Sequence, residues 1–506
     1  MEITAATGRL GACETVFDVR AEVPAEGEFT IPDYQPEIWK IVKTKAEPVV
    51  VSRLAVGARA TVEGYVKLSV LYGTKDDQRL CALSQRIPFS KQFELKEPVG
   101  DRYDMFTDVG ADYLNCRAVN GRKIDVRGAL SLSVRILSCA DVDVVTAVDG
   151  AFCRSESAQY LRSVAGARKQ FTLDELLQAD VPENAQPTIL RCEASALVES
   201  AVCFENRAEI KGVVYACAAL ELAEEDGFTV RRSGFKLPFS QIVDLDGVSE
   251  ASAATATAAV LSCTALPELT EDGLISLSVS CELSVDAYAH ESVDYVGDAF
   301  STSSELLITR ATPGVTGAAW AVCEPFTYSD GFDKQPGQLI DYFLSRCHTA
   351  LVVENGAAFA ETAGALCIVL ADAGGGANGF DVPFSFRRPL QMTFAGMPFA
   401  SLECVFDTLE CVESDTRISL KATGFINGSA VELLRLSAVL DVRADAAHPK
   451  TPRDMALCAY YADAGEDVFS IAARFNTSPR AIAEENGVDV GVLAQPTVLL
   501  IPIVEQ

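Results

Sequence analysis

The sequence is poor in the residues and patterns on which most enzymes depend. Its 506 residues include only three histidines, and these (His290, His348 and His448) lie in three separate segments. His348 follows Cys347, but neighbouring side chains on a strand point to opposite faces, so the two cannot form a thiol–histidine site without a further partner. The H-E-x-x-H, G-x-S-x-G and Walker patterns are all missing. We therefore expect surface or loop positions for the histidines, no enzyme activity, no catalytic residue, and neither a cofactor nor a metal site.

Basic residues are also scarce. The chain carries 42 Lys and Arg against 71 Asp and Glu, which gives a formal charge of −29. A field of this sign repels phosphate backbones and anionic lipid headgroups, so it argues against nucleic-acid binding and against a polybasic membrane anchor. We interpret the acidic excess as a solvated surface that keeps the protein soluble.

Long apolar runs are missing as well. No stretch reaches the roughly 18 consecutive apolar residues of a membrane-spanning helix. The first residues lack the basic and apolar regions of a signal peptide. We therefore expect no integral membrane segment and no export, and so a cytoplasmic protein.

The 16 cysteines show none of the C-x-x-C spacing that metal and redox sites use. The closest two are Cys404 and Cys411, and several others, such as Cys203, Cys217 and Cys367, lie among apolar strand residues. In a reducing cytosol such cysteines act as small buried hydrophobic residues. We expect structural thiols, with late oxidative cross-linking as the alternative.

The chain before its last 50 or so residues contains a degenerate repeat. Two features recur in each copy, a glycine within an alternating strand and the first residue of a Pro-Phe-Ser sequence. They are Gly64, Gly212 and Gly364, and Pro88, Pro238 and Pro383. The glycines lie 148 and 152 residues apart and the prolines 150 and 145. Such a period is the length of a whole domain, not of a short solenoid unit.

Each copy is rich in strand patterns. Apolar residues alternate with small or polar ones over residues 62–72, 124–136 and 274–285, which is the period of a strand with one buried face. Long alternating strands separated by turns are typical of antiparallel sheets packed as a sandwich or an open barrel. The Pro-Phe-Ser sequences are predicted to start strands, with the phenylalanine packed inward, because proline is tolerated at first or edge positions.

We therefore predict a mainly β chain with three tandem, antiparallel, β-sandwich-like domains. They are placed at residues 1–150, 165–300 and 320–447, and the third is divergent. The end of the chain, residues 455–506, has the pattern of a small strand–helix–helix–strand (βααβ) module. An apolar stripe with helical spacing predicts its first helix. Ser478-Pro479 begins the second helix and Asn486-Gly487 ends it, because these residue types favour the N-cap, first-turn and left-handed positions.

This pattern resembles a LysM domain. The usual family signature consists of a Gly-Asp-Thr turn, an Ile-Ala pair, an Asn-Gly and a final Ile-Pro. The corresponding residues here are Gly465-Glu466-Asp467, Ile471-Ala472, Asn486-Gly487 and Ile501-Pro502. Two positions differ from the family: Glu466-Asp467 replaces the Asp-Thr pair, and Pro496 stands where a glycine usually precedes the last strand.

The resemblance implies a groove between the first-turn loop and the loop after the second helix, where LysM domains hold polymers of N-acetylglucosamine. The implied groove residues are Gly465, Glu466, Asp467, Val468, Phe469, Asn486, Gly487 and Val488. Phe469 is the expected anchor if its ring is exposed, because aromatic residues dominate binding energies at interfaces. The alternative is that Phe469 packs on the second helix.

The β-rich part resembles the SPOCS domain of spore-coat-associated proteins. The resemblance rests on the Asp/Pro segment at residues 31–36, on the strand from Val62-Glu63-Gly64 to Leu71-Tyr72, and on Ile87-Pro88-Phe89-Ser90. It covers the first copy well, the second moderately and the third faintly. SPOCS copies followed by one LysM domain are the arrangement of SipL-type spore morphogenesis proteins.

That arrangement implies a non-enzymatic role in assembling the spore coat. In SipL-type proteins the LysM domain contacts a coat-basement ATPase, stage IV sporulation protein A, at the forespore surface on the mother-cell side. The β domains are then expected to bind other coat proteins. The alternative function is binding of peptidoglycan, a polymer that contains N-acetylglucosamine, in the LysM groove.

Overall fold

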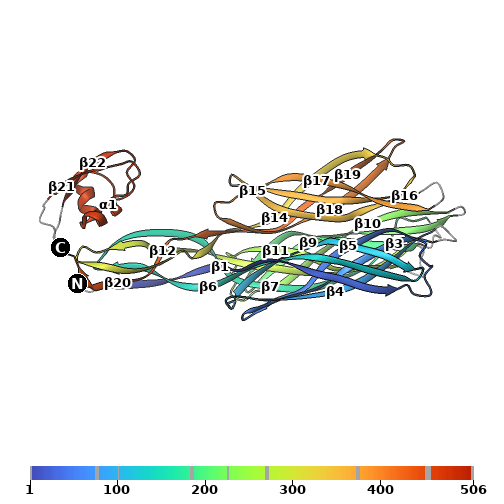
Figure 1. Cartoon of the computed structure of the whole chain (residues 1–506), viewed down its shortest axis with the longest axis horizontal. Helices are drawn as coiled ribbons and strands as arrows, with labels where there is room; N and C mark the ends of the chain where they lie inside the picture. The colour runs from blue at the N-terminus through green and yellow to red at the C-terminus, as the bar shows by residue number, and fades with distance from the viewer. Residues whose placement is uncertain are drawn as a thin grey trace.

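The computed structural model of this chain describes residues 3–74, 79–100, 102–182, 187–224, 227–267, 273–371, 376–450 and 457–502. Over these residues it contains 22 strands and two helices. Figure 1 shows most of the strands gathered in one elongated β body, with the helices in a small module at one end. The prediction of a mainly β chain is confirmed. Neither described helix, at eight residues each, is long enough to cross a membrane.

The first β segment, residues 4–149, forms two three-stranded antiparallel sheets. Their strand orders are β1-β6-β5 and β2-β3-β4. The strands are β1 (Thr4–Thr30), β2 (Lys40–Val56), β3 (Arg59–Gly73), β4 (Leu80–Glu94), β5 (Arg102–Asn120) and β6 (Lys123–Asp149). Both sheets contribute to one core, in which Val62, Leu68, Ile124 and Leu132 are fully buried.

The second β segment, residues 152–300, has the same arrangement, with strand orders β7-β12-β11 and β8-β9-β10. Its strands are β7 (Phe152–Gln178), β8 (Thr188–Phe204), β9 (Arg207–Glu224), β10 (Gly227–Asp244), β11 (Ala253–Pro267) and β12 (Leu274–Phe300). Ile210 and Leu277 lie fully buried in its core. Because β7 already begins at Phe152, residues 152–164 belong to a strand, although the sequence-based boundary left them outside the second domain.

The third β segment, residues 304–449, repeats the two sheets as β14-β19-β18 and β15-β16-β17, with an additional β13-β20 pair. Its strands are β13 (Ser304–Ala311), β14 (Gly314–Asp333), β15 (Leu339–Glu354), β16 (Ala357–Ala371), β17 (Ala377–Thr393), β18 (Met397–Glu413), β19 (Arg417–Arg435) and β20 (Ala438–Pro449). Ala360 and Ile426 are fully buried in its core. A single pairing, Thr316 with Leu161, connects β14 to β7 and so joins the sheets of the second and third segments.

Each smaller sheet pairs the glycine of the repeat with the phenylalanine of Pro-Phe-Ser. The register partners are Gly64 and Phe89, Gly212 and Phe239, and Gly364 and Phe384. A Cβ at any of the three glycines would lie within 2.8 Å of the phenyl ring and within 2.5 Å of a carbonyl oxygen on the strand at the other side. Only glycine therefore lets the ring close over the backbone at these positions.

The Pro-Phe-Ser sequences lie inside β4, β10 and β17 and not at the strand starts that we predicted. Each of these strands is the edge of its sheet. An edge strand has one side without a neighbour, so a proline in its interior need not cost the sheet a hydrogen bond. The predicted inward packing is confirmed for Phe89, Phe239 and Phe384, which are 6–8% exposed.

The longest strands continue beyond these sheets as a narrow stalk, which we define as residues 3–12, 140–162, 288–311 and 438–449. Figure 1 shows β1, β6, β12 and β20 running along it toward the chain ends. Its interior is closed by residues from all three β segments, among them Val145, Val296 and Val439, each fully buried. The three segments therefore share one core in the stalk in addition to their own cores.

The tail module, residues 457–502, follows in the order β21 (Leu457–Ala462), α1 (Val468–Phe475), α2 (Pro479–Asn486) and β22 (Thr497–Pro502). β21 and β22 pair antiparallel. Both helices pack on one face of this pair, where Ile471, Ile482, Leu499 and Ile501 form the core. Figure 1 shows the module beside the free end of the stalk.

Two cysteines depart from the prediction of structural thiols. Cys13 and Cys139 face each other on β1 and β6 and are joined by a disulfide bond. They lie 126 residues apart in the sequence, so only the long-range pairing of the two strands brings them together. The prediction is therefore wrong for this pair, whereas the other 14 cysteines have free thiols.

Candidate functional site

Both helices of the tail module begin and end where their capping residues require. The Asp467 carboxylate accepts hydrogen bonds from the Ser470 backbone N–H (3.1 Å) and hydroxyl (3.0 Å) at the start of α1. The Ser478 hydroxyl accepts from the Ala481 N–H (3.3 Å) at the start of α2. Gly487, with φ of 64°, ends α2 in the left-handed conformation that glycine adopts without strain. These caps fix the loops that the sequence assigned to the binding groove.

The first-turn loop of the tail module lies against residues 491–493. The Gly465 N–H donates to the Leu493 carbonyl (2.8 Å), the Leu493 N–H donates to the Glu466 carbonyl (2.8 Å), and the Val468 N–H donates to the Gly491 carbonyl (3.0 Å). The structure therefore brings the predicted first-turn residues next to the loop after α2. Residues 491–493 were missed from the sequence, because backbone groups make these contacts and no side-chain type marks them.

The predicted residues at the end of α2 have a different role. The Asn486 side chain bonds both the N–H and the carbonyl of Leu500, each at 2.7 Å, and so ties α2 to β22. Val488 is half-buried against the module core, while Gly487 and Gly465 are exposed. The Asn486 side chain, the polar one among these residues, therefore already has hydrogen-bond partners within the module.

The Glu466 carboxylate is engaged as well. It accepts hydrogen bonds from the Asp463 backbone N–H (3.0 Å) and the Tyr460 hydroxyl (2.9 Å). Arg474 lies 3.5 Å away. The bonds from Asp463 and Tyr460, with the nearby guanidinium, lower the pKa of Glu466, so this side chain is an anion that shapes the turn.

Phe469 is buried, and residues of the stalk cover it. Phe469 is only 4% exposed. Its ring packs edge-on against the ring of Phe300, with the ring centres 5.1 Å apart. The guanidinium of Arg154 lies 4.9 Å from the ring centre and also forms an ion pair with Asp467. The ring is therefore not an exposed anchor, and it packs on the end of β12, a contact that neither of our alternatives anticipated.

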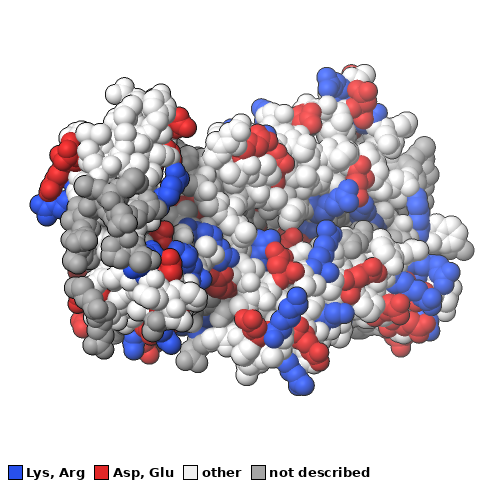
Figure 2. Space-filling view, turned by 60° about the vertical axis from the view of Figure 1, so that its left-hand side comes forward, with Lys and Arg blue, Asp and Glu red and all other residues white. Residues whose placement is uncertain are grey.

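Val490 and Val492 are exposed in the loop after α2, and a second exposed apolar surface of the tail module lies on the opposite face of β21 and β22. Leu457 (51% exposed), Tyr461 (65%), Val498 (59%) and Leu500 (39%) alternate with residues that face the core. Tyr461 and Val498 are register partners, so the four side chains occupy one face of a two-stranded sheet. We call these four residues the outer face. In Figure 2 the module, at the upper left, is drawn mostly as uncharged residues, whereas acidic and basic residues are interspersed over the rest of this view.

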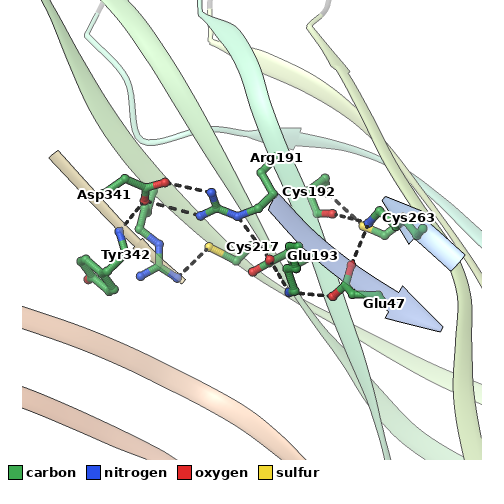
Figure 3. A network of polar contacts seen from close by, with 11 residues as sticks. Glu47, Arg191, Cys192, Glu193, Cys217, Cys263, Asp341 and Tyr342 are labelled. Atoms are coloured by element: carbon green, nitrogen blue, oxygen red, sulfur yellow. Dashed lines mark hydrogen bonds and ion pairs between the residues drawn. The ribbon is translucent and has the colours of Figure 1, made fainter. Parts of the chain in front are cut away.

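A second polar site lies where the smaller sheets of the three β segments meet. Lys45 of β2 pairs with Glu193 of β8 (2.7 Å), Glu193 contacts Arg191 (3.2 Å), and Arg191 pairs with Asp341 of β15 (2.8 Å). Figure 3 shows this ionic chain passing from one segment to the next. Apolar residues from all three segments, including Val42, Leu190 and Phe343, are buried around it.

The ionic chain keeps its charges although it is buried. Burial alone raises the pKa of Glu193, but the charges of Lys45 and Arg191 outweigh this effect and lower it to about 2. Burial lowers the pKa of Lys45, and Glu193 and Glu47 raise it by more. Glu193, Lys45 and Arg191 therefore keep their charges and hold one another, which is the role of a structural network.

A separate cleft of about 730 Å³ touches all three β segments. Its charged lining consists of Arg20, Arg53, Arg102, Arg135, Arg168, His348, Asp18, Asp104, Asp108 and Asp286. Several of these groups bind one another or the backbone: Arg135 pairs with Asp18 (2.8 Å), and Arg168 donates to the Arg53 carbonyl (2.7 Å). The cleft is thus a polar seam between segments.

Two carboxyl groups in the cleft, those of Asp104 and Asp286, have raised pKa values. Burial, followed by the negative charge of Asp286, raises the pKa of Asp104 to about 8, and the two carboxyl groups are hydrogen-bonded to each other. Burial also raises the pKa of Asp286, against the opposing charges of Arg168 and Arg53. Asp104 lies on β5 and Asp286 on β12, so this pair joins the first and second segments.

The pair predicts a pH-dependent stability. Because the folded pKa of Asp104 lies above its ordinary value of 3.8, its stabilising effect is complete below that value and is lost as the pH rises through about 8. Asp104→Asn keeps a neutral group there, so we expect its melting temperature to exceed that of the wild type by about 3–5 °C near pH 9 and to converge with it near pH 4. Thermal melts across this pH range measure the difference.

Asp108→Asn is the matched control. Asp108 lines the same cleft but its side chain is 63% exposed, so this variant should follow the wild-type curve. Parallel curves for wild type and Asp104→Asn across the range would contradict the raised pKa of Asp104.

His290, His348 and His448 are all exposed, as predicted. His348 lies at the rim of the cleft with its Nδ1 3.8 Å from Asp108, and His448 contacts Asp445 at 2.8 Å. Among the described residues, no group of three or more His, Cys, Asp or Glu is placed to hold a metal ion.

Comparison with known protein families finds a match in the first β segment. A family model described as the SPOCS domain of SipL matches residues 37–119. Residues 37–119 are similar to a SPOCS domain. Neither the curated proteins nor the solved structures yielded a match. The similarity indicates a sporulation-related protein.

The matched residues include β2, β3 and β4 and nearly all of β5. They therefore cover the whole smaller sheet of the first segment, including the paired Gly64 and Phe89 and the first members of the ionic chain, Lys45 and Glu47. The same sheet order recurs in the second and third segments.

Proposed function

We propose that this chain is a non-enzymatic assembly protein of the spore coat. In this proposal, residues 1–150, 165–300 and 320–447 are three SPOCS-like domains, and residues 455–506 are a LysM domain. The LysM domain docks on stage IV sporulation protein A at the mother-cell side of the forespore surface, and the β domains bind other coat proteins. Support comes from the match at residues 37–119 and from the sheet order that recurs in all three β segments.

The outer face of the tail module is the observation that carries this proposal. Tyr461 and Val498 are exposed to 65% and 59%, while the Phe469 side of the module is held by the stalk. An exposed aromatic and aliphatic face suits a protein partner, because aromatic anchors in desolvated patches supply most of the energy of such interfaces. A contact made by one small module gains strength when linked modules bind at the same surface.

Binding of the full-length chain to purified, polymerised stage IV sporulation protein A tests the proposal. We expect saturable binding that Tyr461→Ser weakens by about tenfold or more, which corresponds to about 1.4 kcal/mol. Leu266→Ser is the matched control, because Leu266 is 68% exposed but lies on β11 of the second segment. Thermal melts establish that both variants remain folded.

Peptidoglycan is the competing partner, and the same experiment includes it. Washed peptidoglycan is incubated in parallel with the wild-type chain. Retention on peptidoglycan without binding to the ATPase would overturn the proposal and favour the glycan groove. Equal weakening by Tyr461→Ser and Leu266→Ser would also contradict it, because the loss would then not be specific to the outer face.

A further inference from the structure

The two sheets of the second β segment are connected by a pair of buried thiols. Cys192 lies on β8 and Cys263 on β11, and their sulfur atoms are 2.9 Å apart. A disulfide bond has an S–S length of about 2.0 Å, so a movement of less than about 1 Å separates the thiol pair from a bonded pair. The residues are 9% and 7% exposed and belong to the core between the sheets.

The position of Cys192 connects this pair to the junction of the three segments. Cys192 lies between Arg191 and Glu193, and side chains alternate along a strand. Its sulfur therefore points into the core of the second segment, while Arg191 and Glu193 point toward the ionic chain, in which Arg191 meets Asp341 at 2.8 Å. A bond that fixes β8 at Cys192 therefore also fixes Arg191 and Glu193, which the same strand supplies to the ionic chain.

We propose that Cys192 and Cys263 form a redox site that closes to an inter-sheet disulfide when the protein meets a small peroxide. The hydrogen bond to Cys263 and burial raise the pKa of the Cys192 thiol, so the Cys263 sulfur is assigned as the attacking group. It loses its proton as it attacks one peroxide oxygen and becomes a sulfenic acid, and the other peroxide oxygen takes up that proton and leaves as water. The second sulfur then displaces the sulfenic oxygen as another water. For hydrogen peroxide, two thiols and one peroxide give one disulfide and two waters, so the sulfurs lose two electrons and the peroxide gains them.

The bond closes a long loop. The two cysteines are 71 residues apart in the sequence, and cross-linking a loop of this length removes much of the conformational freedom of the unfolded chain. We therefore expect the oxidised second segment to melt at a temperature higher by about 5 °C or more than the reduced one. The oxidised form also keeps β8 fixed beneath the junction, which makes the arrangement of the three segments depend on redox state.

Peptide mapping by mass spectrometry tests the assignment on the wild-type chain, so it does not depend on a variant that folds. The full-length protein is treated with hydrogen peroxide, its free thiols are alkylated during denaturation, and it is digested without reduction. We expect a linked peptide pair that contains Cys192 and Cys263. Recovery of both cysteines as alkylated thiols, or of either one linked to a different cysteine, would overturn the proposal.

Thermal melts of three variants give the second readout. Cys192→Ala and Cys263→Ala should lose the rise in melting temperature on oxidation. Cys281→Ala should keep it, because Cys281 is fully buried in the same core but lies outside the proposed pair. A rise that persists in Cys192→Ala would assign the stabilisation to another bond and would contradict the proposal.

Discussion

Replacing Asp341 with alanine is expected to lower the free energy of unfolding by about 3–5 kcal/mol. The Asp341 side chain is 1% exposed and that of Arg191 is 9% exposed, so solvent cannot replace the lost carboxylate. Arg191 would retain Glu193 at 3.2 Å, but Glu193 is already shared with Lys45. One buried positive charge would therefore be left without full compensation. Urea unfolding followed by circular dichroism measures the loss.

Asp381→Ala is the matched control for this prediction. Asp381 pairs with Lys43 and also joins the third segment to the first, but its side chain is 38% exposed. Exposed ion pairs contribute at most about 1 kcal/mol, so this variant should be close to the wild type. Equal losses in both variants would show that burial of the ionic chain does not decide its contribution. The double variant Arg191→Ala/Asp341→Ala should lose less than the sum of its two single variants, because the partners act as one unit.

The sequence predicted the strands because their pattern is local. Over residues 124–136 the apolar positions repeat every second residue, and the structure buries Leu130, Leu132, Val134 and Ile136 completely. The pairing of Gly64 with Phe89 can also be detected in the sequence, since both residues recur at the spacing of the repeat. Periodicity of this kind reports which face of a strand is buried, but not which other strand covers it.

The ionic chain could not be predicted in the same way. Lys45 and Glu193 are 148 residues apart and Arg191 and Asp341 are 150 apart, so each pair joins equivalent or nearby positions of successive copies. A charged residue at the same place in two copies was a usable signal. It did not reveal opposite charges in contact, because the sequence does not show that the copies meet around a common centre.

The tail module shows the same limit on a smaller scale. Its caps at Asp467, Ser478 and Gly487 follow from residue types and spacing, and the structure places them at the helix ends. The burial of Phe469 does not follow from them. It depends on Phe300 and Arg154, which lie 169 and 315 residues before Phe469 along the chain, and on the length of the stalk that carries both.

Gly212→Ala is expected to destabilise the second segment by about 2–3 kcal/mol, the range of an overpacked core. The added Cβ would lie 2.0 Å from the Leu197 carbonyl oxygen and 2.6 Å from the Phe239 ring. The ring is able to rotate away, but the carbonyl belongs to β8, which also carries Arg191 and Glu193. The strand has to shift, and the shift is transmitted to the junction. Thermal and urea unfolding measure the effect.

Gly234→Ala separates this close approach from the ordinary cost of changing a glycine. Gly234 lies on β10, the strand next to Gly212, and a Cβ there would meet nothing within 4 Å. Alanine at such a position reduces the freedom of the unfolded chain, so this variant should be neutral or more stable by up to about 1 kcal/mol. If both variants lose stability alike, Gly212 is required for its backbone freedom and not for the close packing of the Phe239 ring. If only Gly212→Ala does, the same reasoning extends to Gly64 and Gly364, whose Cβ positions are blocked by Phe89 and Phe384 in the same way.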